Sequence, residues 1–149
     1  MTEASAGKAP IVVGVDGSDA SKAALKWAVG QAQLSGAPLE VILSWHVPMG
    51  FYGFSLPEPV ADDVRSETRR ELDTIIAEVV GDPASVAMTL QVVEGAPAPV
   101  LIEASEHASL LVVGNRGRGA FAGMLLGSVT QHCVANSACP VVVVREPDA

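Results

Sequence analysis

The chain has 149 residues, of which 49 % are apolar and 17 % are charged, and its formal net charge is −8. That length suits one domain, which can stay folded without a metal or a disulfide framework. The negative charge argues against nucleic acid and anionic membranes as partners, because both attract positive surfaces. No apolar run approaches the roughly 20 residues of a membrane helix. Residues 1–9 lack the apolar stretch of a signal peptide, so we expect a flexible tail there, one domain over 10–147 and a cytoplasmic location.

Short apolar runs alternate with helical periods along the chain. Continuous β-branched runs are typical of strands buried on both faces, whereas apolar residues three or four apart are typical of helices. In chain order the pattern predicts a strand at 11–15, a helix at 19–34, a strand at 39–45, a helix at 61–80, a strand at 86–92, a short helix ending at 107, a strand at 110–113, a helix at 127–136 and a strand at 140–144. This alternation predicts an α/β fold, a doubly wound parallel sheet of five strands with helices on both faces.

Two segments depart from that regular pattern. Residues 48–59 hold three prolines and two glycines, which predicts a long loop that is either a plain connection or a functional lid. Residues 86–92 alternate apolar and polar side chains, which predicts a strand with one solvent-exposed face at the edge of the sheet.

Two turns are candidates for a binding site. Ligands of an open parallel sheet bind beyond the carboxyl ends of its strands, where the strand order reverses. Asp16-Gly17-Ser18 follows the first strand, and its aspartate is either a ligand group or a plain turn residue. Residues 114–128 follow the fourth strand and hold five glycines, which let backbone N–H groups approach a ligand at the start of a helix. This segment predicts a phosphate site, and the alternative is an ordinary flexible loop.

The motifs of several other sites are missing from the chain. There is no G-x-x-x-x-G-K-[ST], which excludes a P-loop NTPase. Ser128 has no evident base or nucleophile elbow, so we expect no serine hydrolase and assign no catalytic residue. The histidines share no metal-ligand spacing, so we expect no metal site made by the protein alone. Cys133 and Cys139 are expected to be inert core thiols.

The spacing Gly114-x2-Gly117-x9-Gly127-Ser128 resembles the G-2x-G-9x-G-[ST] pattern of ATP-binding universal stress proteins. Residues 12–18, 93–97 and 137–144 are similar to three further blocks of that family, in the same order. The resemblance covers the chain after its tail. It implies the strand order 3-2-1-4-5, bound ATP with Mg²⁺ bridging the phosphates, and a homodimer formed through residues 141–144.

The resemblance also implies a role for each matching residue. Asp16 corresponds to the family's acid near the ribose and a bridging metal. Ser44, with Trp45 as the second choice, corresponds to the adenine contact at the end of the second strand. The other implied positions are Gly14 and Val15 beside the adenine, Val113 and Gly114 beside the ribose and base, Arg116 and Gly117 facing the ribose and phosphates, and Gly127, Ser128, Val129 and Thr130 in the phosphate cradle.

The function that this resemblance implies is a regulatory or sensing module that binds ATP in a stress response. Two alternatives stay open. One is a slow, Mg-dependent ATP hydrolase, because water near bound phosphates and a metal can react without a dedicated base. The other is an interaction protein of the same fold that binds another adenine nucleotide, including a cyclic one, or none.

Overall fold

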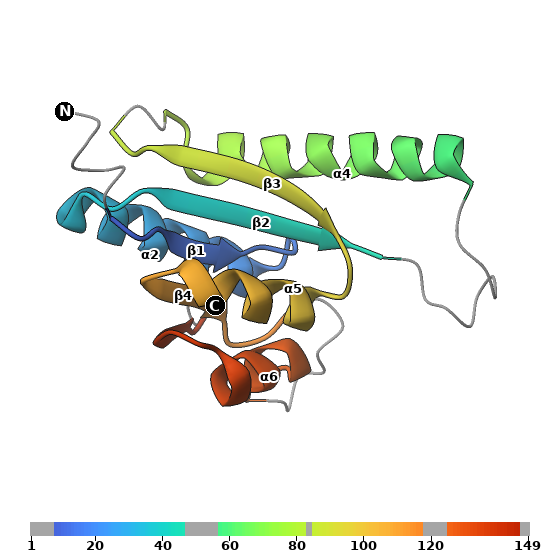
Figure 1. The fold of residues 1–149 in the computed structure, drawn as a ribbon. Coiled ribbons are helices and arrows are strands. Elements are labelled where there is room, and N and C mark those ends of the chain that lie inside the picture. Colours follow the sequence, from blue (N-terminus) through green and yellow to red (C-terminus); the bar gives the residue numbers. More distant parts are fainter. Residues whose placement is uncertain (1–7, 47–56, 83–84, 118–124, 147–149) are drawn as a thin grey trace.

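The computed structural model of the chain describes residues 8–46, 57–82, 85–117 and 125–146. These residues form a five-stranded sheet in the order β3-β2-β1-β4-β5, and every neighbouring pair is parallel (Figure 1). The strands are β1 (Ile11–Gly14), β2 (Leu39–Trp45), β3 (Met88–Glu94), β4 (Leu110–Gly114) and β5 (Val141–Val144). The predicted fold class and strand order are confirmed, and β3 and β5 are the two edges.

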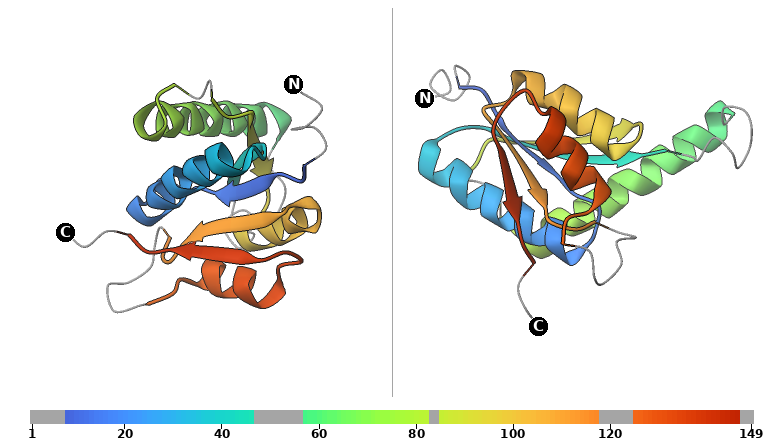
Figure 2. Two further views of the ribbon diagram at one scale, coloured as in Figure 1. Left: turned by 90° about the vertical axis from the view of Figure 1, so that its left-hand side faces the viewer. Right: turned by 90° about the horizontal axis from the view of Figure 1, so that it is seen from below.

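Helices cover both faces of the sheet (Figure 2). One face carries α2 (Asp19–Ser35) and α4 (Glu58–Val79). The opposite face carries α5 (Pro97–Ala104), which the 3₁₀ turn η1 (Ser105–His107) extends, and α6 (Ser128–Asn136). None of these helices, within the described part of the chain, is long and apolar enough to cross a membrane.

Each face of the sheet buries its own apolar cluster. Successive side chains of β1 point to opposite faces, so Val13 joins the cluster beneath α2 and α4 while Val12 joins the cluster beneath α5 and α6. Both valines are 0 % exposed. This double burial is the physical reason for the continuous apolar runs of the central strands.

Helix α2 has the start and the end that its sequence predicts. The Ser18 hydroxyl accepts a hydrogen bond from the backbone N–H of Ser21 at 3.2 Å, which satisfies a donor of the first turn. At the other end Gly36 adopts φ 75° and donates to Ala32 O at 2.9 Å. Glycine takes this left-handed conformation without steric cost, so the helix stops there.

Helix α4 begins three residues earlier than the sequence analysis predicts. Pro57 is its N-cap and Pro59 lies in its first turn. First-turn N–H groups have no partner inside a helix, so a proline there costs no hydrogen bond. The prediction that 58–59 belong to the loop was wrong for this reason. Residues 47–56, which hold the rest of that loop, and residues 1–7 of the predicted tail lie outside the described residues.

Candidate functional site

A cavity of about 490 Å³ lies at the carboxyl ends of β1, β2 and β4. Its size is within the range of small-molecule sites, and its place is the switch point where strand order reverses. All twelve residues predicted for the site line it, namely Gly14, Val15, Asp16, Ser44, Val113, Gly114, Arg116, Gly117, Gly127, Ser128, Val129 and Thr130. Trp45, the second choice for the adenine contact, lines it too.

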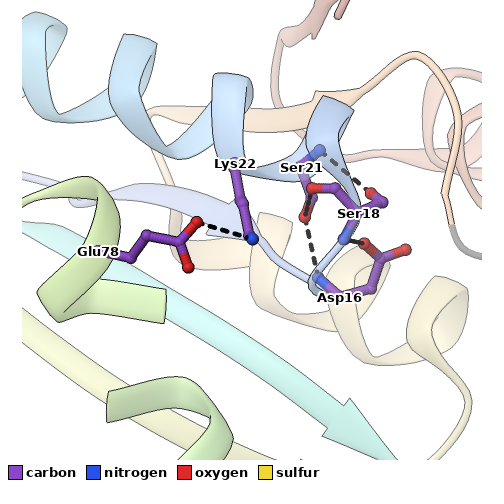
Figure 3. A network of polar contacts seen from close by, with 5 residues as sticks. All are labelled: Asp16, Ser18, Ser21, Lys22 and Glu78. Atoms are coloured by element: carbon purple, nitrogen blue, oxygen red, sulfur yellow. Dashed lines mark hydrogen bonds and ion pairs between the residues drawn. The ribbon is translucent and has the colours of Figure 1, made fainter. Parts of the chain in front are cut away.

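The Asp16 turn is held by a compact set of hydrogen bonds (Figure 3). Asp16 Oδ1 accepts from the Ser18 N–H at 2.9 Å, and the Asp16 N–H donates to Ser21 Oγ at 3.1 Å. The Ser21 hydroxyl in turn donates to Ser18 O at 3.1 Å. Asp16 is therefore a turn residue, as one reading of the sequence expects, and its carboxylate also lines the cavity. Ser21, which is buried at 5 % exposure, was missed by the sequence analysis.

The Asp16 turn and the glycine loop meet at Gly117. A Cβ added to Gly117 would lie 2.6 Å from Asp16 Oδ2, so a larger residue there would push the carboxylate away. A Cβ at Gly127 would contact the Gly117 backbone at 3.4 Å. Gly117 and Gly127 thus allow the backbone at 116–117, the backbone before α6 and the Asp16 carboxylate to lie close together, as the spacing motif predicts. Residues 118–124 of the loop lie outside the described residues.

Gly14 and Gly114 are required by packing as well as by the cavity. A Cβ on Gly114 would lie 2.7 Å from the carbonyl carbon of Ala20, and one on Gly14 would lie 2.6 Å from Leu101 Cδ1. These two glycines let the start of α2 and the side of α5 close onto the strand ends. The sequence analysis assigns both to the ligand alone, whereas the structure gives them a second role.

Asn115 connects the glycine loop to the edge strand β5. Its N–H donates to Val144 O at 2.8 Å, and its carbonyl accepts from the Gly127 N–H at 2.8 Å. Its side-chain amide donates to Leu125 O at 3.2 Å and accepts from the Glu146 N–H at 3.2 Å. Asn115 is 4 % exposed, and its position inside the glycine motif was the signal that the sequence analysis passed over.

Two of the predicted phosphate contacts already have partners within the protein. Arg116 forms an ion pair with Glu146, and the two side chains are 28 % and 29 % exposed. The Thr130 hydroxyl donates to Gly114 O at 2.6 Å and is buried at 3 % exposure. The Thr130 hydroxyl therefore fixes α6 to the end of β4. Ser128 is the exposed hydroxyl in the first turn of α6.

Helix α4 contributes two polar residues that were not predicted, Thr68 and Glu71. Both lie on the same side of the helix as the apolar residues Val64 and Ile75, since 64, 68, 71 and 75 follow helical spacing. A polar residue on an apolar stripe is a usable signal for a site. Glu71 is the second acidic residue of the cavity lining, in addition to Asp16.

Trp45 presents a buried donor at the cavity wall. Its side chain is 8 % exposed, and among the described residues its indole Nε1 has no hydrogen-bond partner. Buried donors are nearly always paired, so this buried N–H is an exception among the described residues.

The described residues offer little for a metal by themselves. They contain no group of three His, Cys, Asp or Glu side chains close enough to hold a metal ion.

The strand order and the cavity define an α/β protein with a cavity at the switch point of its parallel sheet. Residues 9–145 match the model of the Universal stress protein family. The chain belongs to this family, as its motifs indicate.

Curated relatives support the same assignment. A universal stress protein of Mycolicibacterium smegmatis is 34 % identical over 145 residues, which cover 93 % of this chain and 48 % of the relative. Another from Mycobacterium tuberculosis is 37 % identical over 143 residues, which cover 93 % of this chain and 46 % of the relative. The chain spans about half the length of these curated relatives.

Solved structures of the family share the fold. The universal stress protein UspA from Lactobacillus plantarum superposes with a TM-score of 0.75 at 23 % identity, over 91 % of this chain and 97 % of that one. A universal stress protein solved in complex with cAMP has a TM-score of 0.61 at 30 % identity, over 93 % of this chain and 97 % of that one.

Proposed function

We propose that this chain binds an adenine nucleotide, with ATP as the first candidate, and acts as a regulatory or sensing module in a stress response. One observation carries the proposal: the twelve residues that the family resemblance implies for a nucleotide, which come from four separate segments of the chain, all line one cavity at the switch point.

The base end of the ligand fits the half of the cavity beside β2 and α5. This wall contains apolar side chains from Ile42, Leu43, Pro97 and Leu101, which suit the faces of a purine.

The phosphate end fits the half of the cavity beside α6. The backbone N–H groups and the hydroxyl of Ser128 lie at the start of this helix, where its dipole favours an anion. Arg116 adds a guanidinium at the same end. Mg²⁺ is usually held by one or two carboxylates and the ligand's phosphates, so the Asp16 carboxylate fits the protein's share of such an ion. When bound, the ion would offset the repulsion between Asp16 and the phosphates.

Identification of the retained ligand tests this proposal directly. Protein purified without added nucleotide is heat-denatured, and the released small molecules are identified by mass spectrometry. Calorimetric titration of the ligand-free chain with Mg·ATP, Mg·GTP and adenosine then compares affinities. We expect ATP or another adenine nucleotide to be bound, and Mg·ATP to bind more tightly than Mg·GTP. Absence of any adenine compound together with no binding of Mg·ATP would contradict the proposal.

The charge of the cavity favours a second candidate, an adenine nucleotide with a single phosphate, including a cyclic one. The described lining contains the carboxylates of Asp16 and Glu71, and its guanidinium at Arg116 is already paired with Glu146. A triphosphate needs a metal ion to enter this field, whereas a cyclic monophosphate brings one negative charge. The relative solved with cAMP agrees with this candidate. Titration with cAMP and ATP in EDTA separates the two, because only the triphosphate should lose its affinity without Mg²⁺.

Slow hydrolysis of ATP remains a further alternative for the same site. Among the described residues that line the cavity, none stands out as a dedicated base, so we expect phosphate release from Mg·ATP at less than about 1 s⁻¹, the low end of ordinary enzymes. A coupled phosphate assay measures this rate. Faster turnover that Glu71→Gln or Ser128→Ala abolishes would make the chain an enzyme.

A further inference from the structure

Glu146 follows the edge strand β5 and contacts the arginine expected to bind phosphate. Its carboxylate forms an ion pair with Arg116, and each of the two side chains is less than one third exposed. Its backbone N–H donates to Asn115 Oδ1 at 3.2 Å. The position of Glu146 is therefore fixed by its backbone as well as by its charge.

Asn115, which holds the backbone of Glu146 in place, is buried in the fold. Asn115 is 4 % exposed and bonds to β5 through Val144 O and to the glycine loop through Leu125 O. Because Asn115 immediately precedes Arg116, the segment after β5 and the glycine loop are joined at the rim of the cavity. The Glu146 carboxylate thus lies beside the Arg116 guanidinium.

Building on the nucleotide function proposed above, we propose that Glu146 is a selectivity-determining residue whose carboxylate competes with the ligand's phosphates for Arg116. Carboxylate and phosphate oxygens both accept hydrogen bonds from the edge of a guanidinium, so one partner displaces or weakens the other. The competition penalises only ligands that contact Arg116 through a phosphate. A nucleoside with no phosphate is not affected.

The other charged residues of the cavity make the competition for Arg116 important for phosphate binding. Among the described residues that line it, Arg116 is the one lysine or arginine, whereas Asp16 and Glu71 contribute carboxylates. Pairing with Glu146 removes much of the positive field that a phosphate chain would use at this end of the site. Glu146 therefore sets how strongly the site prefers ligands with more phosphates.

Calorimetric titration of the full chain in Mg²⁺ buffer tests the competition. ATP, tripolyphosphate and adenosine are titrated into the wild type, Glu146→Gln and Glu106→Gln. Glu146→Gln should tighten ATP and tripolyphosphate by about two- to fivefold, the range for a partly exposed ion pair, and leave adenosine unchanged. Glu106→Gln should change none of them, because it removes the same charge from an exposed position in η1, before β4 and away from the cavity. In an Arg116→Gln background, Glu146→Gln should have no effect.

Three results would overturn the inference. Unchanged affinity in Glu146→Gln means that there is no competition. Weaker affinity means that Glu146 holds Arg116 in place for the phosphate. Equal tightening in the Arg116→Gln background, or in Glu106→Gln, means that only the net charge matters.

The tripolyphosphate arm separates this inference from the proposed function. If ATP and adenosine fail to bind while tripolyphosphate binds Glu146→Gln more tightly than the wild type, the adenine function is wrong and the competition stands. If ATP binds the wild type and Glu146→Gln equally, the function stands and the competition is rejected. If none of the three compounds binds any variant, both are rejected.

Discussion

At the residue scale, Asp16 combines a structural role with an expected ligand role, and a substitution can separate them. Asp16→Asn keeps an oxygen that accepts from the Ser18 N–H, so the turn should stay intact. It removes the charge that would hold Mg²⁺. We expect Mg·ATP affinity to fall about tenfold, as for loss of a charged contact, whereas ATP affinity in EDTA should be equal or higher because a repulsive charge is gone.

Asp19→Asn is the matched control for that experiment. Asp19 is exposed in the first turn of α2, so its substitution should leave both affinities unchanged. Calorimetry with and without Mg²⁺ provides the comparison. Equal Mg·ATP affinity in Asp16→Asn and the wild type would mean that Asp16 acts only as a turn residue.

Gly117 provides a second test at the residue scale. Gly117→Ala places a Cβ 2.6 Å from Asp16 Oδ2, so the carboxylate has to move. The same methyl group at Gly30 meets nothing within 4 Å. We expect Gly117→Ala to weaken Mg·ATP binding severalfold and Gly30→Ala to leave it unchanged, as measured by the same titration. Weaker binding in both variants would point to a general effect on the fold.

At the scale of elements, the buried hydrogen bond from Thr130 to Gly114 O joins α6 to the end of β4. Thr130→Val keeps the shape of the side chain and leaves a buried carbonyl without this donor, which costs about 1–3 kcal/mol of unfolding free energy. Thr74→Val removes a similar hydroxyl bond, to Arg70 O at 2.9 Å, from an exposed position on α4 and should cost less than about 0.5 kcal/mol. Urea denaturation measures both variants, and equal stabilities would contradict a structural role for the Thr130 hydroxyl.

The two cysteines differ in their elements and should differ in reactivity. Cys133 on α6 is 0 % exposed, and burial raises the pKa of its thiol from 9.0 to about 11. Cys139, before β5, is only partly buried, so the prediction that both are core thiols was wrong for this residue. The thiolate is the reactive form, so at pH 8 folded Cys133 should stay unlabelled until the protein unfolds. Ellman's reagent on Cys139→Ser measures Cys133 alone, and rapid labelling of that folded variant would contradict its burial.

At the scale of the whole molecule, the edge strand β5 is the feature from which a homodimer is expected. It ends the described sheet with one edge unpaired, and such an edge favours pairing with a second copy about a two-fold axis. Both faces of β5 are already packed: Val142 and Val144 contact the cluster beneath α2 and α4, and Val141 and Val143 contact the other. The expected homodimer therefore depends on the backbone of this edge.

Proline substitutions separate the edge from the core of the sheet. Pro140 O and Val144 O accept bonds from β4, so by alternation the N–H of Val142 faces β4 and the N–H of Val143 faces the open edge. Val143→Pro should shift a dimer toward monomer with a modest loss of stability. Val142→Pro should lower stability far more, because it breaks the ladder to β4. Light scattering after size exclusion measures the mass, and a wild-type mass near one chain would end the dimer prediction.

The sequence by itself determined the element order and the parallel, doubly wound sheet, and its resemblance to the family implied twelve of the residues that line the cavity. The β-α alternation forces all strands to run parallel, so the turns after β1 and β4 have to meet at one edge. Glycine spacing then marks where backbones approach closely, as the contact between Gly117 and Asp16 shows. The element order and the glycine positions follow from local patterns, which a sequence carries directly.

Only the tertiary structure decided which partner each polar group takes. Glu146 pairs with Arg116, 30 positions away, and the Thr130 hydroxyl turns to Gly114 O instead of the cavity. Thr68 and Glu71 reach the cavity because α4 packs across β2 and β3, which the spacing within that helix does not encode. The physical reason is that a side chain's partner depends on how distant elements pack, whereas periodicity records only which face of its own element it occupies.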